Sequence, residues 1–442
     1  MTRAGKTLRI RDGRGVLILD HQGIGNVVMS IPLLRAVSEW ARDRWPVWVT
    51  LEGPARAQVL AQEGLNIIPI YYQPKCNARE RLSALRAALQ GQVDLVIAIP
   101  QISALKTALL TPLLGARHSV AEAMPRWSWA LSSTVRKGWT KPILESQQQI
   151  AAVLGIEAPL NPPSIRVTVD EADWARSTIA HSALGSAKPL IGLHCSSGEP
   201  TKKWPAANFG EVVRRLKCGF SDLAVISFGS AAERTDADAA RLAAGPGPWL
   251  EGAGAWTIRQ SLAMLHQCDL VITADTSIMH MAAAVGARTL SVFAPTSAQR
   301  LAPSYNIGTA LFPRIACCPC FRDRFKKCSC MNLIGPQHVV LAARELICTA
   351  PGKSEHAAGD GCMLPSCLAQ YETYPTVNWQ RSWRAEPCQP SRVSGGQPLI
   401  TVRRKPAPNH DCRMIIRPHF QGANTRLSRG AALKCTSGNY EQ

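Results

Sequence analysis

The sequence has no run of 18 or more consecutive apolar residues, which excludes an ordinary membrane-spanning helix. Its most apolar stretch, VDLVIAIPQISALKTALLTPLLG, is interrupted by Asp94, Gln101 and Lys106. The basic start of the chain leads into strand-like residues, without the apolar core and cleavage site of a signal peptide. We therefore expect a cytoplasmic protein whose only membrane contact would be peripheral, at the inner face of the cytoplasmic membrane.

Acidic residues are scarce. The chain has 31 Asp and Glu against 50 Lys and Arg, which gives a net charge of +19. Such a charge favours acidic partners: a nucleotide, a phosphorylated lipid, an anionic membrane surface or nucleic acid. A solvated basic surface with no specific partner would have the same composition. With 46% hydrophobic and 18% charged residues, most of the chain should be globular.

The 15 cysteines do not form the regular pattern of a disulfide framework. One group is clustered in CCPCFRDRFKKCSCM, and its members are Cys317, Cys318, Cys320, Cys328 and Cys330. The 7-residue gap between the two halves of this cluster is short for a zinc ribbon. We predict no metal site here; a disulfide or free thiols fit the spacing better.

Apolar strand-like runs alternate with helical patterns in the first half, which predicts an α/β domain with a parallel sheet. The predicted strands are 15–20, 46–51, 67–71 and 93–99, and the predicted helices are 27–41, 55–63, 78–89 and 147–154. The proline-rich stretch GIEAPLNPPSIRVTVD then indicates a boundary.

The alternation restarts in the second half. The predicted strands there are 189–194, 223–228, 270–273 and 289–293, and the predicted helices are 207–217, 231–242, 258–267, 278–285 and 336–347. Two similar halves imply a cleft with ligands at the carboxyl ends of the strands. Periodicity is lost near residue 350. We therefore divide the chain into a first Rossmann-like domain (1–155), a linker and boundary (156–187), a second Rossmann-like domain (188–348), and a basic, poorly ordered tail (349–442).

The loop in GLHCSSGEPTKKWPAANF follows a predicted strand and precedes a predicted helix. Ser196, Ser197 and Thr201 supply hydroxyl groups, and Lys202 supplies a positive charge. Short donors and a cation on a loop of this kind suit a diphosphate, although an ordinary basic loop has the same composition.

The segment DLVITADTSIMHMAAAVGARTLSVFAPTS carries the sharpest pattern. A predicted buried strand ends at Asp275, Thr276 and Ser277 begin the next helix, and His280 lies one turn further on. Backbone N–H groups there suit phosphate oxygens, and a carboxylate can accept sugar hydroxyl protons. The alternatives are that Asp275 only caps the helix and that His280 is a buried structural imidazole.

Upstream, Glu233 in FGSAAERTDA can bind ribose hydroxyls or complement a helix dipole.

Gly23, Gly25 and Asn26 form the loop GIGN after the first predicted strand. The loop resembles the beginning of a dinucleotide fingerprint, but Val28 occupies the third glycine position. The missing glycine argues against a nucleotide-dependent oxidoreductase or epimerase.

Together these segments resemble the heptosyltransferase family of inverting GT-B glycosyltransferases, from about residue 16 to residue 346. The resemblance rests on GIGNVVMSIPLLRAV, IGLHCSSGEPTKKWPAANF, FGSAAERTDA, DLVITADTSIMHMAAAVGARTLSVFAPT and CCPC…CSCMNLIGPQHVV, which occur in the family's order and spacing. It implies a GT-B fold of two Rossmann-like domains facing a cleft. The implied reaction transfers heptose or a related sugar from an ADP-heptose-like donor to lipopolysaccharide core or a similar glycan.

The resemblance also implies roles for individual residues. Lys202 would bind phosphate, Glu233 the donor ribose, and Asp275 with Thr276 the sugar and phosphate; His280 matches the histidine of that motif. Ser196 and Ser197 would stand in for hydroxyl residues on the phosphate loop. The nucleotide sugar is a substrate, so no cofactor, metal or nucleic-acid partner is implied.

Two positions depart from the family pattern. Asn26 stands where the family has an aspartate as general base, and Ser277 replaces a glycine. An amide cannot take the acceptor's proton, so His21 on the same loop is the substitute candidate. The other interpretation of Asn26 is a non-catalytic relative that binds a nucleotide sugar or glycan.

Overall fold

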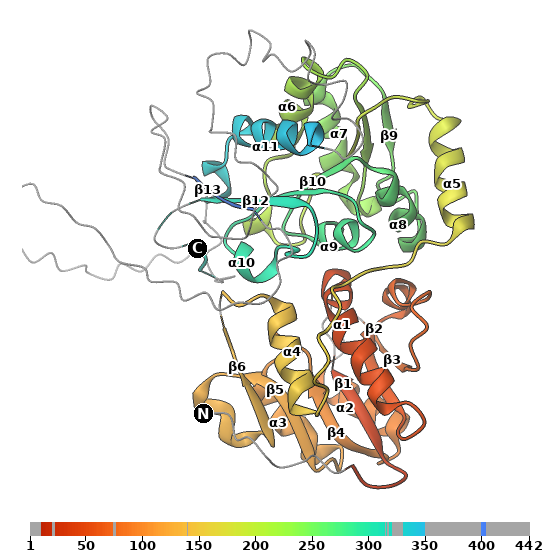
Figure 1. Ribbon diagram of the computed structural model, residues 1–442, viewed down its shortest axis with the longest axis vertical. Helices are drawn as coiled ribbons and strands as arrows, with labels where there is room; N and C mark the ends of the chain where they lie inside the picture. Colours follow the sequence, from red (N-terminus) through yellow and green to blue (C-terminus); the bar gives the residue numbers. More distant parts are fainter. Residues whose placement is uncertain are drawn as a thin grey trace, which may run out of the picture. The chain divides into compact units, whose positions relative to one another are not determined.

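The computed structural model describes residues 10–19, 23–73, 77–138, 140–313, 315, 318–320, 330–349 and 399–403. These residues form two α/β halves, each built on its own sheet (Figure 1). The site candidate His21 and the cysteines Cys317 and Cys328 lie outside the described residues.

A six-stranded parallel sheet in the order β3-β2-β1-β4-β5-β6 forms the first half. Its elements are β1 (Gly15–Leu19), α1 (Ile24–Ala41), β2 (Val47–Glu52), η1 (Pro54–Val59), β3 (Ile68–Tyr72), α2 (Ala78–Leu89), β4 (Val93–Ala98), α3 (Ala104–Leu113), β5 (His118–Ala123), η2 (Pro125–Ala130), β6 (Ser133–Arg136) and α4 (Ile143–Val153).

The second half repeats this strand order as β9-β8-β7-β10-β11-β12, and β13 adds to its far edge antiparallel to β12. Its elements are α5 (Val169–Ala180), β7 (Leu190–His194), η3 (Pro200–Lys202), α6 (Ala206–Lys217), β8 (Ala224–Ser227), η4 (Ala231–Glu233), α7 (Arg234–Ala244), β9 (Trp249–Glu251), α8 (Ile258–Gln267), β10 (Leu270–Ala274), α9 (Ser277–Ala284), β11 (Thr289–Val292), α10 (Ala298–Leu301), β12 (Gly308–Pro313), η5 (Cys330–Leu333), α11 (Pro336–Cys348) and β13 (Leu399–Arg403).

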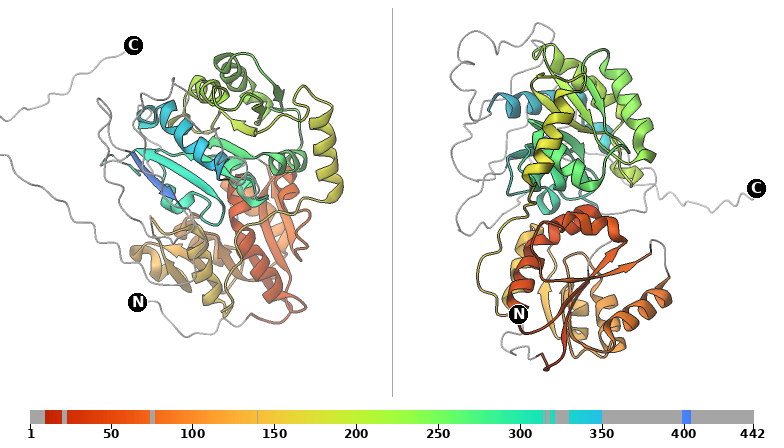
Figure 2. Two further views of the ribbon diagram at one scale, coloured as in Figure 1. Left: turned by 45° about the horizontal axis from the view of Figure 1, so that its top comes forward. Right: turned by 90° about the vertical axis from the view of Figure 1, so that its right-hand side faces the viewer.

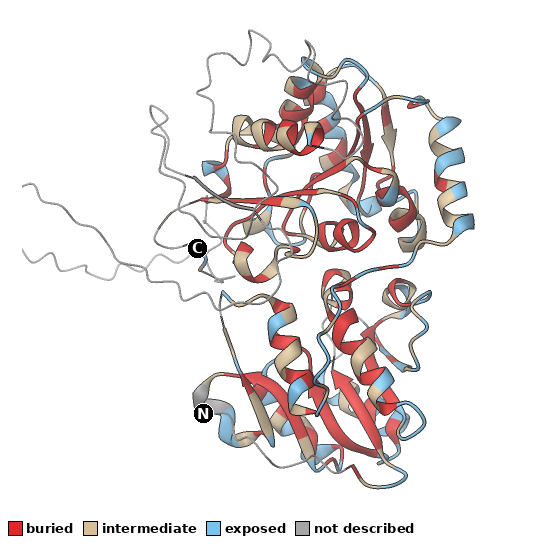
Figure 3. Ribbon diagram, viewed as in Figure 1, coloured by how far each residue is buried: buried red, intermediate tan, exposed pale blue. Residues whose placement is uncertain are grey.

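Helices lie over both faces of each sheet (Figure 2), and most strand residues are buried (Figure 3). In β1, Val16 and Ile18 belong to one hydrophobic cluster while Leu17 and Leu19 belong to another. Alternate residues of a strand point to opposite faces, so a strand covered by helices on both sides is apolar throughout. This is why the central strands read as unbroken apolar runs.

The strands and helices that the sequence indicated are present, and three of the predictions need correction. The structure also has elements that the sequence did not indicate: α3, β5, β6, β9, α10 and β12. The predicted helix 55–63 is the shorter 3-10 helix η1, which begins after Gly53 at a positive φ of 75°. The predicted linker 156–187 contains α5, which starts with a Thr168–Glu171 capping box and packs against α8. The strand β13 falls in the predicted tail.

None of the helices in the described ranges combines the length and the apolar character needed to cross a bilayer.

Candidate functional site

Each sheet reverses its strand order at its centre, between β1 and β4 in the first half and between β7 and β10 in the second. Ligands of open parallel sheets bind outside the carboxyl ends of the strands at such a reversal. The residues that directly follow β7 and β10 are therefore the first place to look for a site. Most of the residues singled out in the second half lie there.

Lys202 and Asp275 come from different loops and form an ion pair, with Nζ and Oδ2 3.0 Å apart. Asp275 follows β10, and its side chain is only 5% exposed. Thr296, in the loop after β11, donates a hydrogen bond to the same oxygen at 2.6 Å. The carboxylate is thus oriented from two sides, while the lysine side chain keeps 23% exposure. This arrangement puts a cation and a buried carboxylate within reach of one ligand.

His280 lies in the first turns of α9, and its side chain is buried. Burial lowers the pKa of His280 to about 4, against the opposing charge of Asp275. The imidazole is therefore neutral near pH 7 and a weak base. Its neighbour across the two halves is Gly25 of α1: a Cβ at Gly25 would lie 2.9 Å from His280 Cδ2 and 3.2 Å from the Cα of Ser277. Glycine at position 25 lets the two helices meet.

His194 is the last residue of β7 and connects two loops of the site. Its Nε2 lies 3.5 Å from Glu233 Oε1, and its Nδ1 lies 3.1 Å from Thr276 Oγ1. Glu233 also accepts hydrogen bonds from the backbone and hydroxyl of Ser230. The hydrogen bond with His194 and those with Ser230 lower the pKa of Glu233 to about 2, despite partial burial. Glu233 is therefore ionised and pre-oriented.

Thr276 precedes α9 at the N-cap position, but its side chain makes no capping hydrogen bond within the described part of the chain. Its hydroxyl turns instead to His194 and to Thr273, whose Oγ1 lies 3.0 Å away. The first N–H groups of α9, beginning at Ser277, are thereby left for another acceptor. Such N–H groups and the helix dipole together suit an anion.

The loop after β7 is held in shape by packing. Trp204 is fully buried, donates from Nε1 to the carbonyl of Ile334 at 2.8 Å and packs against Phe209. Ser196 is also buried, and the Ser197 hydroxyl accepts from the backbone N–H of Glu199 at 3.3 Å. Thr201 lies in η3 beside Lys202 and is partly exposed. These hydroxyl-bearing residues lie on the same loop as Lys202, as the sequence predicted.

Asn26 lies in the first turn of α1, next to Gly25 and partly exposed. Its backbone N–H donates to the carbonyl of Gly23 at 3.0 Å. Within the described residues, the structure assigns no hydrogen bond to its side-chain amide. Because Gly25 approaches His280 and Ser277 closely, the first turn of α1 lies against the first turn of α9. Asn26 thus lies on the wall of the site opposite to α9.

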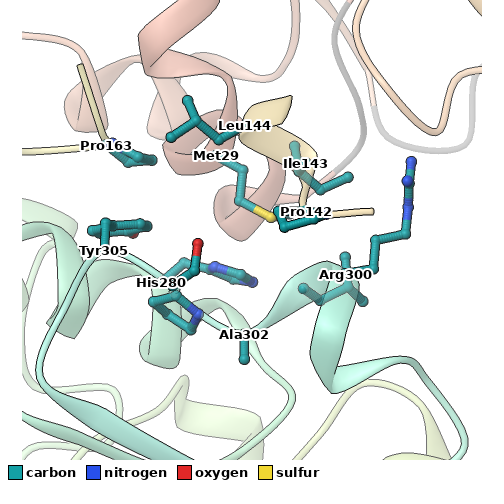
Figure 4. Close-up of a pocket in the computed structure, with 12 residues that line it drawn as sticks. Met29, Pro142, Ile143, Leu144, Pro163, His280, Arg300, Ala302 and Tyr305 are labelled. Atoms are coloured by element: carbon teal, nitrogen blue, oxygen red, sulfur yellow. The ribbon is translucent and has the colours of Figure 1, made fainter. Parts of the chain in front are cut away.

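An apolar pocket adjoins His280 between the two halves (Figure 4). Met29 of α1 and Pro142 and Ile143 at the start of α4 line one side, and His280 and Ala302 line the other. Tyr305 also lines the pocket; burial raises the pKa of its phenol, and its hydroxyl has no hydrogen-bond partner among the described atoms. The pocket offers a mainly apolar surface beside the polar cluster.

A buried ion pair joins the halves next to this pocket. Arg300 of α10 binds Glu122 of β5, with Nη2 and Oε2 2.7 Å apart, and their side chains are 3% and 1% exposed. Arg300 also donates to the carbonyls of Gly138 and Lys141, and Glu122 accepts from Ser146 at 2.9 Å. The loop that carries Thr296 is thus anchored to the first half.

Sequence reasoning missed His194, Thr296 and Arg300. His194 ends β7 at the reversal, and Thr296 lies in the loop after the neighbouring strand β11. A position at the carboxyl end of a parallel strand was the signal that could have found both. Among the described members of the cysteine cluster, Cys330 is buried, and Cys318 and Cys320 are partly exposed. No group of metal-ligating side chains is found within the described ranges.

Two Rossmann-like halves with a polar cluster at the carboxyl ends of the strands define a GT-B-like nucleotide-binding architecture. The model of glycosyltransferase family 9 (heptosyltransferase) matches residues 82–329, which is more than half of the chain. The chain belongs to this family.

Sequence comparison with individual proteins agrees with this family assignment. The chain is 27% identical over 330 residues to lipopolysaccharide heptosyltransferase 1 of Pseudomonas aeruginosa, covering 70% of this chain and 86% of that protein. It is 25% identical over 177 residues to lipopolysaccharide heptosyltransferase 2 of Escherichia coli, covering 39% and 47%. The matched part thus spans about half the length of the latter relative.

Solved structures support the fold alone. A family 9 glycosyltransferase from Veillonella parvula superposes with a TM-score of 0.62 at 17% identity, covering 78% of this chain and all of that one. The E. coli ADP-heptose lipopolysaccharide heptosyltransferase II superposes with a TM-score of 0.56 at 18% identity, covering 75% and 98%. The predicted GT-B fold is confirmed.

Proposed function

We propose that the protein is an inverting glycosyltransferase that transfers heptose or a related sugar from an ADP-heptose-like donor to lipopolysaccharide core or a similar glycan. The observation that carries this proposal is the convergence of Lys202, Asp275 and the uncapped start of α9 at the reversal of the second sheet. A cation and free N–H groups suit a diphosphate, and an adjacent buried carboxylate suits sugar hydroxyls. Family membership supports the same chemistry.

The second half would hold the donor. Lys202 and the N–H groups of α9 neutralise the diphosphate as it leaves, so the proposal requires no metal or other cofactor. Glu233, ionised and held by His194, accepts hydrogen bonds from the ribose hydroxyls. Ser196, Ser197 and Thr201 on the loop after β7, and Ser277 at the start of α9, would supply short donors to the phosphates.

The first half would hold the acceptor. The acceptor hydroxyl attacks the anomeric carbon opposite to the diphosphate; a new C–O bond forms as the bond to the diphosphate breaks. The hydroxyl proton must go to a base. The Asn26 amide can orient the hydroxyl through its oxygen but cannot take the proton. His280 is too weak a base near pH 7 because of its lowered pKa. His21 stays the candidate base.

The test begins with a thermal-shift screen of nucleotide sugars and continues with a transfer assay on the sugar that stabilises the protein. We expect release of nucleoside diphosphate that depends on acceptor, and loss of this release in His21→Ala. Release that is unaffected by acceptor, or no stabilisation by any nucleotide sugar, would contradict the proposal.

A non-catalytic binding protein is the second candidate, and Asn26 is the observation that favours it. Asn26→Asp separates the two functions. If the wild-type protein binds donor without turnover and Asn26→Asp creates turnover, the native protein is a binding module. If wild-type turnover is present and the substitution changes only its rate, the native protein is a transferase.

A further inference from the structure

Helix α3 exposes three leucines at a helical spacing. Leu105, Leu109 and Leu113 are 38%, 59% and 47% exposed, and residues four positions apart lie on one face of a helix. The opposite face is packed, because Ala104, Thr107 and Thr111 are buried (Figure 3). We call the three leucines the α3 face.

An exposed tryptophan lies close to this helix. The 3-10 helix η2 packs against α3, and its Trp129 is 78% exposed. Other large exposed apolar side chains of the second half are Leu242 on α7, Ile307 just before β12 and Leu333 on η5. Single exposed apolar residues are ordinary on protein surfaces, whereas gathered ones mark an interaction surface.

The surroundings of the α3 face are basic. The chain has no Asp or Glu from residue 95 to residue 121. Lys106 on α3 and Arg86 on α2 are exposed, and Arg86 Nε donates to the carbonyl of Leu113 at 3.0 Å, which places this arginine beside the α3 face. Asp94, the nearest preceding carboxylate, is fully buried and paired with arginines. An anionic partner would therefore meet little repulsion here.

We propose that the α3 face, together with Trp129 and the flanking cations, docks on the surface of an anionic lipid bilayer. A helix with leucines on one face, basic residues beside them and a neighbouring tryptophan has the composition of an interfacial helix. Lysine and arginine would pair with anionic headgroups while the leucines enter the boundary of the acyl chains. The observation that favours an anionic bilayer over a protein partner is the stretch 95–121, which has no Asp or Glu and lies beside exposed cations.

The docking itself does not depend on the sugar donor, but its purpose rests on the proposed function. The α3 face belongs to the half that is proposed to bind the acceptor. Docking there would bring a glycan that is anchored in a bilayer to the acceptor side of the site.

Sedimentation with vesicles tests the proposal directly. The full-length protein is mixed with vesicles of phosphatidylcholine alone or of phosphatidylcholine with phosphatidylglycerol, at low and high salt. We expect binding to the anionic vesicles only, weakened by salt. The triple variant Leu105→Gln/Leu109→Gln/Leu113→Gln should bind vesicles roughly tenfold more weakly, because it removes the three leucines that would be partly buried in the bilayer. Glutamine has nearly the helix propensity of leucine, so α3 should persist.

The matched control is Leu242→Gln/Ile307→Gln/Leu333→Gln, which removes three exposed apolar side chains from the second half. It should bind vesicles as the wild-type protein does, and both triple variants should melt cooperatively near the wild-type temperature. Absence of wild-type binding, or equal loss in both triple variants, would overturn the proposal. So would a concentration-dependent dimer that only the α3 variant abolishes. Nucleotide-sugar stabilisation, measured without vesicles, reports on the proposed function separately.

Discussion

Two buried carboxylates, one in each half, lie at opposite ends of parallel strands. Asp94 is the second residue of β4, at the amino end of the first sheet, and its side chain is fully buried. Asp275 directly follows β10, at the carboxyl end of the second sheet, and is nearly as buried. Both are paired with cations, yet their surroundings differ.

Asp94 is held by five hydrogen bonds from the backbone and side chain of Arg11 and from the side chain of Arg117. Asp275 is held by one lysine and one hydroxyl, Lys202 and Thr296. Rigid guanidinium forks saturate a carboxylate, whereas a lysine is a single charge on a flexible stem that can be shared with a phosphate. We therefore interpret Asp94, at the amino end of its strand and bound by two arginines, as structural. Asp275, at the carboxyl end of its strand and bound by a lysine, is the candidate for ligand binding.

The largest effect is expected where a third buried carboxylate joins the halves. Arg300→Met keeps most of the side-chain volume but leaves Glu122 buried without a counter-charge. We expect the free energy of unfolding to fall by about 3–5 kcal/mol. Denaturant titration followed by circular dichroism measures this change.

The control for Arg300→Met is the double variant Glu122→Gln/Arg300→Met, which also removes the unpaired charge. It should recover a large part of the lost stability. If the single variant is as stable as the wild-type protein, the pair does not hold the halves together.

Asp94→Ala should lower the free energy of unfolding by about 2–3 kcal/mol and leave nucleotide affinity unchanged, since the charges left behind are partly exposed. Although burial raises the pKa of Asp94, hydrogen bonds from Arg117 and Arg11 hold it well below its usual value. The folded pKa is thus the lower one. The contribution of Asp94 is present above its unfolded pKa of about 4 and is lost as the pH falls towards the folded pKa.

Unfolding titrations at neutral pH and under acid conditions measure this dependence. The difference between wild type and Asp94→Ala should be full at neutral pH and should shrink in acid. A difference that grows as the pH falls would contradict the structural role assigned to Asp94.

Lys202→Ala should act on binding, and should weaken nucleotide-diphosphate affinity by about 1.5–3 kcal/mol, because a charged hydrogen bond is lost. The matched control is its neighbour: Lys203 is exposed and pairs with Asp236 at 2.7 Å. Lys203→Ala should change affinity by less than about 1 kcal/mol, as exposed pairs contribute little. Calorimetry measures both. Equal effects of the two substitutions would remove the distinction on which the phosphate role of Lys202 depends.

The fold was predictable to a large extent because its central strands are apolar on both faces and the ends of its helices carry clear signals. Helix α2, for example, was predicted with its observed bounds, and the structure shows an Asn77–Glu80 capping box at its start. Helix α3 was missed because the stretch 93–115 is mostly apolar, with only scattered polar residues such as Gln101 and Lys106. Periodicity cannot divide a buried strand from a following helix that exposes leucines.

The site was predictable where a residue type and a strand end coincide in the sequence, as at Asp275 and Lys202. Pairing between loops far apart in the chain was not predictable. The sequence indicates that Thr296 lies in a strand-end loop on the same rim as Asp275, but it does not indicate that the two side chains pair, because β10, α9 and β11 must first bring the two loops together. The same holds for Arg300 and Glu122, which are 178 residues apart in the chain.

The smallest expected effect concerns His194, whose two ring nitrogens serve different loops. In His194→Asn the amide can replace Nδ1 and keep the contact with Thr276, while the contact with Glu233 is lost. In His194→Gln the amide can replace Nε2 and keep Glu233, while Thr276 is released to cap α9. Each variant should weaken ADP binding by about 1 kcal/mol, the net value of one hydrogen bond. Adenosine, which lacks phosphate, separates them: its affinity should fall in His194→Asn and be retained in His194→Gln. If both variants lose adenosine and ADP affinity equally, His194 only fills space at the end of β7.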